Sequence, residues 1–182
     1  MQLLFIQGGG EGSYDWDKPL VNAIKEKLKP DDRLHYPKMP EEENPDYQLW
    51  KTAILNEISL LNEPMVFIGH SLGGSVLLKL LYEEKIHKHC KSLFLVSSPF
   101  WGEPDWHSDA YMLDSNFADK LPTVKKFIYH AEDDQFVPFS HHNRYREHLP
   151  DAMVRTFKEA GHEMLEAVDT MIADLDKLRV EG

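Results

Sequence analysis

The chain has 182 residues, of which 42% are hydrophobic, and a formal net charge of −11. This length suffices for a substantial buried core and predicts a single domain over residues 1–182. An acidic surface repels phosphate backbones, and no cluster of lysine and arginine is dense enough to offset it, so nucleic acid is excluded as an expected partner. No apolar run approaches the roughly 18 residues that span a membrane.

Cysteine usage and the start of the chain favour a cytoplasmic protein. Cys90 is the single cysteine, so an internal disulfide cannot form, and this fits a reducing compartment. The apolar run over residues 1–6 lacks a basic leader and is too short for a signal peptide, so we interpret it as the first strand. The segment His87-Lys88-His89-Cys90 matches no common zinc spacing, and we expect a surface loop there and no bound metal.

A glycine-rich loop follows the first strand, over residues 7–13. A phosphate-binding G-x-G-x-x-G pattern would need a glycine in place of Ser13, and no Gly-Lys-Ser/Thr follows, so nucleotide binding is disfavoured. Glycines also let a backbone approach a reacting group closely. The loop can therefore supply an N–H group to an oxyanion.

Prolines bound the next elements. We expect a helix opened by Asp17 and Pro19 and running to residue 28, a short strand over 33–36, and a helix over 46–61. The apolar face of the second helix is predicted to include Leu49. The acidic run Glu41-Glu42-Glu43 is expected to be a solvated loop or a helix start.

The central segment, residues 65–81, joins a predicted strand to a predicted helix. Between them stands Gly69-x-Ser71-x-Gly73, the G-x-S-x-G pattern. A strand that turns this sharply into a helix exposes the serine in a strained conformation, and the turn requires small residues two positions before and after it. The helix N-terminus offers N–H groups and a partial positive charge to an oxyanion. Ser71 is therefore a candidate nucleophile.

The second half of the chain repeats the alternation. Strands are expected over 92–97, 124–129 and 152–157, and helices over 140–148 and from after residue 162 to about 178. The polar and aromatic segment 99–122 is either a small lid or core packing. Alternating strands and helices predict an α/β fold, with a doubly wound, mostly parallel sheet of about six strands and helices on both faces.

Acidic and histidine side chains follow two of the later strands. A serine hydroxyl needs a base to take its proton, and that base needs an orienting group. In doubly wound sheets, sites lie beyond the carboxyl ends of the strands. Asp133 and Asp134 follow one predicted strand and His162 follows the last, so these residues are the candidates for orienting acid and base.

The chain resembles the α/β-hydrolase fold in three motifs, which are Gly69-His70-Ser71-Leu72-Gly73, Asp134-Gln135-Phe136-Val137-Pro138 and Gly161-His162. The resemblance covers nearly the whole chain, and the short length without a large cap is similar to the small serine hydrolases of the YdeN type. It implies that Ser71 is the nucleophile, His162 the general base and then acid, and Asp134 the orienting acid. Asp134 fits the family pattern Asp-x-x-Val-Pro, and Asp133 remains the alternative.

The resemblance also implies an oxyanion hole. The N–H of Leu72 would form one half and the N–H of Gly9 the other. Gln7-Gly8 stands where many relatives have His-Gly, and this departure leaves Gly10 open as the second donor.

The remaining candidates are weaker. His70 is assigned to packing, because its side chain should point away from the neighbouring serine. A helix surface is expected for His141, His142 and His148. From segment 99–122, three side chains could enter the site, namely His107, Asp109 and Asp114.

These residues predict a serine hydrolase that cleaves a small neutral ester, thioester or amide through an acyl-enzyme, without metal or organic cofactor. The expected partner is a small-molecule or short peptide substrate, and the sequence leaves the oligomeric state open. Trp101 is predicted to line an apolar acyl pocket, since aromatic side chains offer a large contact area. Two alternatives use the same residues: a hydrolase-like binding protein with little turnover, and an acyltransferase.

Overall fold

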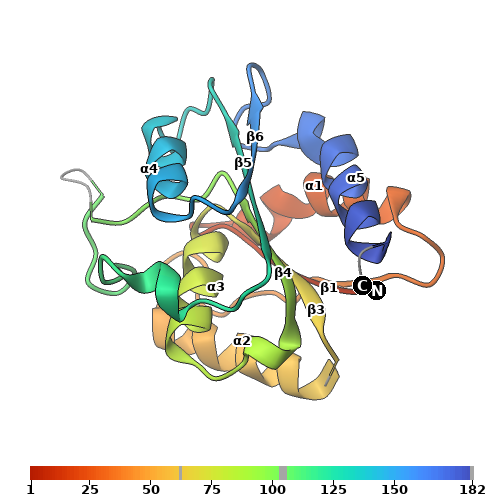
Figure 1. Ribbon diagram of the computed structural model, residues 1–182, viewed down its shortest axis with the longest axis horizontal. Helices are drawn as coiled ribbons and strands as arrows, with labels where there is room; N and C mark the ends of the chain where they lie inside the picture. The colour runs from red at the N-terminus through yellow and green to blue at the C-terminus, as the bar shows by residue number, and fades with distance from the viewer. Residues whose placement is uncertain (62, 103–105, 181–182) are drawn as a thin grey trace.

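The computed structural model describes residues 1–61, 63–102 and 106–180. In this part of the chain, six strands form one sheet in the order β2-β1-β3-β4-β5-β6 (Figure 1). The strands are β1 (Gln2–Ile6), β2 (Arg33–His35), β3 (Met65–His70), β4 (Cys90–Val96), β5 (Lys125–Ala131) and β6 (Met153–Phe157). Every pairing is parallel, so the carboxyl ends of all the strands meet at one edge of the sheet. The predicted parallel sheet of about six strands is confirmed.

Helices cover both faces of the sheet, as the alternating pattern predicts (Figure 1). The helices are α1 (Ser13–Lys27), α2 (Tyr47–Leu61), α3 (Leu72–Glu83), α4 (Ser140–His148) and α5 (Val168–Val180). Buried residues of α1 and α5 share one hydrophobic cluster with the sheet, and those of α2, α3 and α4 share the other. Each of the two layers of helices therefore encloses a hydrophobic core against its own face of the sheet.

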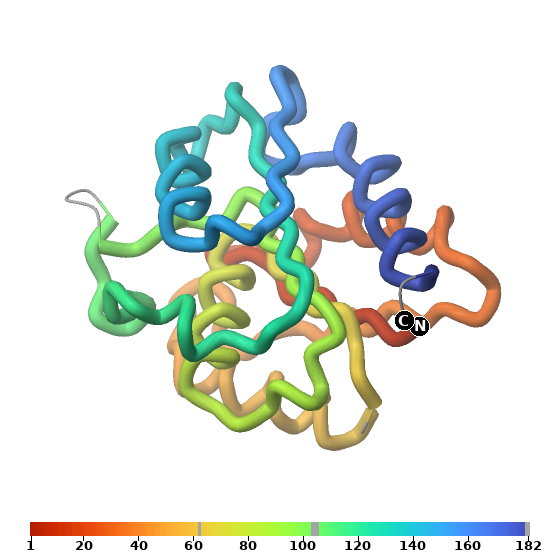
Figure 2. The backbone as a smooth tube through the Cα atoms, viewed as in Figure 1, coloured from red at the N-terminus to blue at the C-terminus, as the bar shows by residue number. Residues whose placement is uncertain are grey.

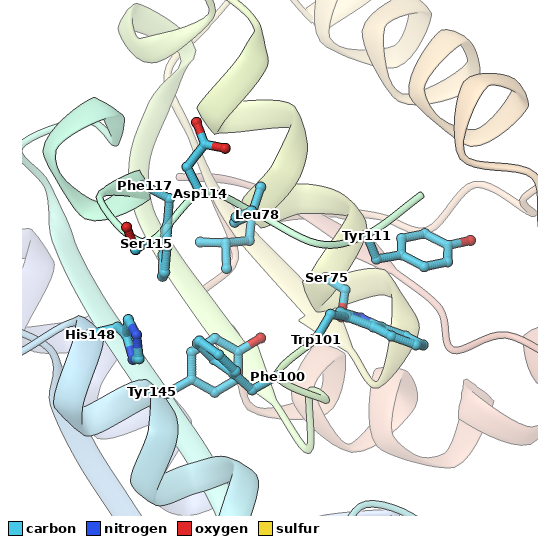
Figure 3. A pocket seen from close by; sticks show the side chains of 11 residues that line it. Ser75, Leu78, Phe100, Trp101, Tyr111, Asp114, Ser115, Phe117, Tyr145 and His148 are labelled. Atoms are coloured by element: carbon cyan, nitrogen blue, oxygen red, sulfur yellow. The ribbon is translucent and has the colours of Figure 1, made fainter. Parts of the chain in front are cut away.

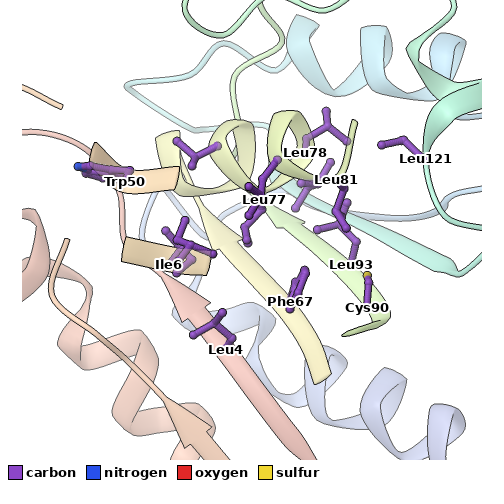
Figure 4. Packing of buried hydrophobic residues seen from close by; sticks show 14 of the residues in the cluster. Leu4, Ile6, Trp50, Phe67, Leu77, Leu78, Leu81, Cys90, Leu93 and Leu121 are labelled. Carbon is purple, nitrogen blue, oxygen red and sulfur yellow. The ribbon is translucent and has the colours of Figure 1, made fainter. Parts of the chain in front are cut away.

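The central strands β3 and β4 are buried along nearly their whole length because both faces of the sheet are covered. Phe67 and Leu93, on β3 and β4, pack against Leu77 and Leu81 of α3 (Figure 4). Burying each such side chain contributes roughly 1.5–3 kcal/mol relative to leaving it exposed. The packing fixes α3, and with it the turn that carries Ser71, over the middle of the sheet.

The first helix begins earlier than predicted, at Ser13, so Pro19 lies inside it rather than at its start. Glu42 holds the extra turn: its Oε2 accepts the Tyr14 N–H at 2.8 Å and the Ser13 hydroxyl at 3.2 Å. Tertiary hydrogen bonds therefore override the helix boundary that proline suggests. The second helix buries Trp50 instead of Leu49, which is 42% exposed, so that part of the predicted apolar face is wrong.

The expected surface histidines of α4 are mostly buried. His141 is 2% exposed and His142 is 1% exposed, so their assignment to the helix surface is wrong. The Phe100 N–H donates to His141 Nδ1 at 2.9 Å. Burial lowers the pKa of His142 to about 4. Sequence periodicity misses this because a short helix packed on the sheet and on a neighbouring loop buries polar as well as apolar positions.

The segment 99–122 contributes to the core as well as to the surface. Tyr111, Phe117 and Leu121 are buried in the cluster around α2, α3 and α4. A single turn of 3₁₀ helix, η2 (Phe117–Lys120), interrupts its irregular course.

The two ends of the described chain lie side by side (Figure 2). The Met1 amino group donates to Asp32 Oδ1 at 2.9 Å, and Arg179 Nη1 donates to the same oxygen at 2.8 Å. This buried carboxylate ties the starts of β1 and β2 to the end of α5, at the amino ends of the strands and therefore away from their carboxyl ends.

Candidate active site

Ser71 occupies a strained turn between β3 and α3. Its φ of 49° and ψ of −123° lie in a sparsely populated region for a residue with a side chain, which costs on the order of 1–3 kcal/mol. A Cβ at Gly69 would lie 2.4 Å from the Gly74 Cα, and one at Gly73 would lie 2.4 Å from the Gln7 carbonyl oxygen. The two glycines of the G-x-S-x-G pattern are therefore required by close backbone contacts.

His162 and Asp134 lie together at the carboxyl end of the sheet. The Nδ1 of His162 is 2.8 Å from Asp134 Oδ2 and 3.0 Å from Oδ1. Oδ1 also accepts the N–H groups of Phe136 and Val137, each at 2.9 Å. Burial alone would raise the pKa of Asp134, but the bonds from His162 and from these amides hold it below its ordinary value. The carboxylate is thus ionised and positioned to orient the imidazole.

Asp133 has a different set of contacts. Its Oδ1 accepts the N–H groups of Ala160 at 3.1 Å and Gly161 at 2.9 Å. These bonds hold the loop that carries His162, whereas the ring of His162 faces Asp134. Neighbouring aspartates therefore contact the backbone and the side chain of the same loop.

Two backbone amides near Ser71 are the candidates for an oxyanion hole. Leu72 is the first residue of α3, and the first amides of a helix have no partner within it. Gly9 lies against Leu72, since a Cβ at Gly9 would be 2.6 Å from Leu72 Cδ2. Within the described residues, the amide of Gly9 has no backbone acceptor, whereas the N–H of Gly10 donates to the Glu42 carbonyl at 2.7 Å. Gly9 and Leu72 thus carry the amides that remain available.

Glu42 is buried, so the expectation of a solvated acidic run is wrong at this position. Its Oε2 accepts from Gln7 Nε2 at 2.7 Å, and its Oε1 pairs with Lys38 at 2.9 Å. Burial opposes ionisation, but Lys38 and the surrounding donors lower the pKa of Glu42 to about 2. Gln7 also accepts the Met39 N–H at 3.0 Å through its Oε1. The buried polar cluster of Gln7, Lys38 and Glu42 therefore holds the glycine-rich loop in place.

The cleft in front of these groups has a volume of about 460 Å³, and both Ser71 and His162 line it. Its rim is aromatic: Trp16 is 45% exposed and Phe136 is 58% exposed, and both rings contact the His162 ring at centroid distances of 6.0 and 5.2 Å. Sequence reasoning missed these two residues. Two sequence signals were available: Trp16 follows the glycine-rich loop, in the first turns of α1, and Phe136 belongs to the Asp134-x-Phe136 motif.

Trp101 lines a second, smaller pocket of about 170 Å³ rather than the cleft (Figure 3). Its indole N–H donates to Ser75 Oγ at 2.9 Å. Ser75 stands one helical turn after Ser71 on α3, so the two cavities are neighbours. The ring of Trp101 contacts that of Trp106, which lines the cleft, at a centroid distance of 5.6 Å. The tryptophans therefore form the wall between the cleft and the second pocket.

The other candidates of segment 99–122 lie outside the cleft. His107 pairs with Asp109 at 3.4 Å in a solvated position. Asp114 accepts from the Tyr82 hydroxyl at 2.5 Å and lines the second pocket.

Cys90 is buried at the start of β4 rather than in a surface loop, so that expectation is wrong. Burial raises the pKa of its thiol to about 12, which keeps it protonated and non-nucleophilic. Among the described residues, no group of three or more histidine, cysteine or carboxylate side chains is arranged to hold a metal ion. None of the described helices is long and apolar enough to cross a membrane.

Comparisons with known proteins agree with this architecture. Residues 12–169 match the family model described as Serine hydrolase. A comparison with curated proteins returned no match. Among solved structures, the ydeN gene product from B. subtilis is 18% identical with a TM-score of 0.71, over 98% of both chains.

Two further structures are similar over the whole chain. The esterase EaEST from Exiguobacterium antarcticum is 15% identical with a TM-score of 0.70, over 98% of this chain and 92% of that one. The meta-cleavage product hydrolase CumD from Pseudomonas fluorescens IP01, solved as a mutant complexed with acetates, is 15% identical with a TM-score of 0.75, over 100% and 91%. These likenesses show that the fold is the α/β-hydrolase fold, here in a compact form without a large cap.

Proposed function

This chain belongs to the serine hydrolase family, and on that premise we propose that it cleaves a small neutral ester, thioester or amide through an acyl-enzyme intermediate. Ser71 is the nucleophile, His162 the general base and then acid, and Asp134 the orienting acid. The observation that supports this assignment best is the contact of His162 Nδ1 with Asp134 Oδ2, at 2.8 Å, in the cleft that Ser71 also lines.

The reaction follows from these positions. The Oγ of Ser71 attacks the substrate carbonyl carbon while Nε2 of His162 takes the hydroxyl proton. The N–H groups of Leu72 and Gly9 donate to the resulting oxyanion. His162 then gives its proton to the leaving group, which departs and leaves the acyl-enzyme. A water molecule, deprotonated in turn by His162, attacks the acyl carbon; the bond to Ser71 Oγ breaks, His162 returns the proton to that oxygen, and the acid is released.

The pocket behind Trp101 supports a short to medium acyl group. Its volume is about 170 Å³, and aromatic and aliphatic side chains line most of it, with Ser75, Asp114, Ser115 and His148 as the polar part; Trp101 lines it and contacts Trp106 of the cleft. In this proposal the acyl chain extends from Ser71 along α3 toward this pocket, and the length of the chain is limited by the indole. The aromatic rim of Trp16 and Phe136 faces the leaving group.

Labelling with a fluorophosphonate probe tests the proposal. The wild-type protein should be labelled at Ser71, and Ser71→Ala should abolish labelling without changing thermal unfolding. Product analysis with and without an alcohol acceptor then separates hydrolysis from acyl transfer. A folded wild-type protein that resists the probe would contradict the proposal and favour a hydrolase-like binding protein.

A further inference from the structure

A second aspartate–histidine pair lies beside the Asp134–His162 pair. His70, the residue before Ser71, and Asp17 of α1 have side chains that are 1% and 3% exposed, and His70 Nδ1 is 2.9 Å from Asp17 Oδ1. The rings of His70 and His162 are 4.7 Å apart between centroids. The interpretation of His70 as simple packing does not account for a buried carboxylate facing it.

The partners of the two ring nitrogens of His70 indicate how many protons the His70–Asp17 pair holds. His70 Nε2 is 2.8 Å from the backbone oxygen of His162, and a carbonyl oxygen can only accept, so Nε2 carries a hydrogen. If Nδ1 carried none, its lone pair would face the lone pairs of Asp17 in a buried site, which is unfavourable. The pair therefore holds one more proton, either on Nδ1 or on the carboxyl group.

Two observations place that proton on His70. The Gly8 N–H donates to Asp17 Oδ2 at 2.8 Å, which favours an ionised carboxylate. Burial would lower the pKa of His70, but the charge of Asp17, the bond to the His162 carbonyl and the more distant charge of Asp134 together raise it above its ordinary value. Among the described residues, Nδ1 has no partner with good hydrogen-bond geometry, so its contact with Asp17 is that of an ion pair.

We propose that Asp17 and His70 form a persistently charged, buried ion pair that positions the three loops of the active site. This inference rests on the proposed function only in taking these loops to carry catalytic groups. Asp17 holds the amide of Gly8, next to Gly9; His70 holds the carbonyl of His162. Since His70 directly precedes Ser71, the oxyanion loop, the nucleophile and the base all connect to one pair. Asp17 and His70 are thus positioning residues that do not touch substrate.

Asp17→Asn separates the charge from the hydrogen bonds. An asparagine can accept the Gly8 N–H with its oxygen and donate to His70 Nδ1 with its amide, while His70 Nε2 keeps its bond to His162. Asp17→Ala removes both the charge and the acceptor. His70→Gln removes the imidazole and identifies its signals in spectra.

The charge is measured by ¹⁵N NMR of the imidazole groups at pH 8, well above the ordinary histidine pKa of about 6.5. The wild-type protein should show His70 with both nitrogens protonated, and Asp17→Asn should show a neutral ring protonated at Nε2. A neutral His70 in the wild-type protein at this pH would overturn the proposal.

Positioning is measured by the low-field proton resonance of His162 Nδ1–H, which reports its bond to Asp134, and by kcat/KM. Asp17→Asn should keep the resonance and lose less than about tenfold in kcat/KM. Asp17→Ala should lose the resonance, and its kcat/KM should fall about 10²-fold. A loss of this size is expected when catalytic groups are displaced by roughly 1 Å. An Asp17→Ala protein with wild-type resonance and rate would overturn the proposal. If Asp17→Ala does not fold, Asp17→Ser is measured in its place, since serine reaches neither Gly8 nor His70.

Both NMR measurements are independent of turnover. Ser71→Ala should lack activity and retain the wild-type signals of His70 and His162, which makes it the matched control. If the wild-type protein shows no hydrolysis while His70 is charged, the proposed function fails and the ion pair stands.

Discussion

At the scale of residues, adjacent aspartates perform different tasks because successive side chains in a turn point in different directions. The Asp134 carboxylate faces the ring of His162, and that of Asp133 accepts two backbone amides of the loop before it. A motif identifies the pair, but the direction of each side chain follows from how the loops after β5 and β6 pack together.

This difference predicts unequal effects of charge removal. Asp134→Asn should lower kcat on the order of 10⁴-fold, because an amide cannot orient His162 in the tautomer that accepts the serine proton. Asp133→Asn should lower it far less, since an asparagine oxygen still accepts from Ala160 and Gly161. Steady-state kinetics on a chromogenic ester measures both, and a reversed ranking would assign the orienting role to Asp133.

At the scale of elements, the conformation of the loop after β1 depends on hydrogen bonds from a distant segment as well as on its glycines. Glu42 reaches it from the segment between β2 and α2 and bonds to Gln7, Ser13 and Tyr14. A buried carboxylate with this many donors stays ionised well below the pH at which it titrates in the unfolded chain.

Glu42 therefore contributes stability that depends on pH in a predictable direction. Its native pKa is about 2, while a glutamate in an unfolded chain titrates at about 4.3. The contribution is complete above the unfolded value and is lost as the pH falls through the native one. Glu42→Gln should melt below the wild type at pH 7, and the difference in Tm should shrink progressively below about pH 4 in thermal unfolding scans. A constant difference across this range would contradict the assignment.

The segment after β4 carries Trp101, whose indole ring lies at the boundary between the cleft and the second pocket. Trp101→Ala should connect the cleft to the pocket behind it, so that esters with longer acyl chains gain in kcat/KM relative to acetate and butyrate esters. Trp16→Ala, at a residue that lines the cleft but not the second pocket, should leave the chain-length preference unchanged and serves as the control. An unchanged chain-length profile in Trp101→Ala would contradict the proposed acyl pocket.

At the scale of the whole molecule, the net charge of −11 acts on the approach of substrates. Like charges repel over about 10 Å at 0.1 M salt and over longer distances at lower salt. Neutral esters should therefore react with a kcat/KM that is nearly independent of salt. Acyl-CoA thioesters, which are anionic, should react slowly at low salt and faster as salt is added. A stopped-flow or steady-state salt series compares the two, and faster reaction of acyl-CoA at low salt would contradict this expectation.

The sequence by itself determined the class of fold and the chemical residue types of the site, because both depend on local patterns. Apolar runs separated by helical spacing specify strands and helices, and parallel order follows from their alternation. The G-x-S-x-G turn must be small at Gly69 and Gly73 for steric reasons that hold wherever a strand meets a helix this closely.

Only the tertiary structure decided what lies around those residues. Local patterns suggest solvent for Glu42, a helix surface for His141, a surface loop for Cys90 and simple packing for His70. In the structure each of these residues is buried, in an environment made by segments distant in the chain. Trp16, Phe136 and Asp17 lie at or beside the site for a related reason, since the parallel strands bring the segments that follow them to one edge of the sheet. Periodicity describes which side of an element is apolar, but it does not carry the identity of the partner that packs on it, and burial, ion pairing and pocket walls all depend on that partner.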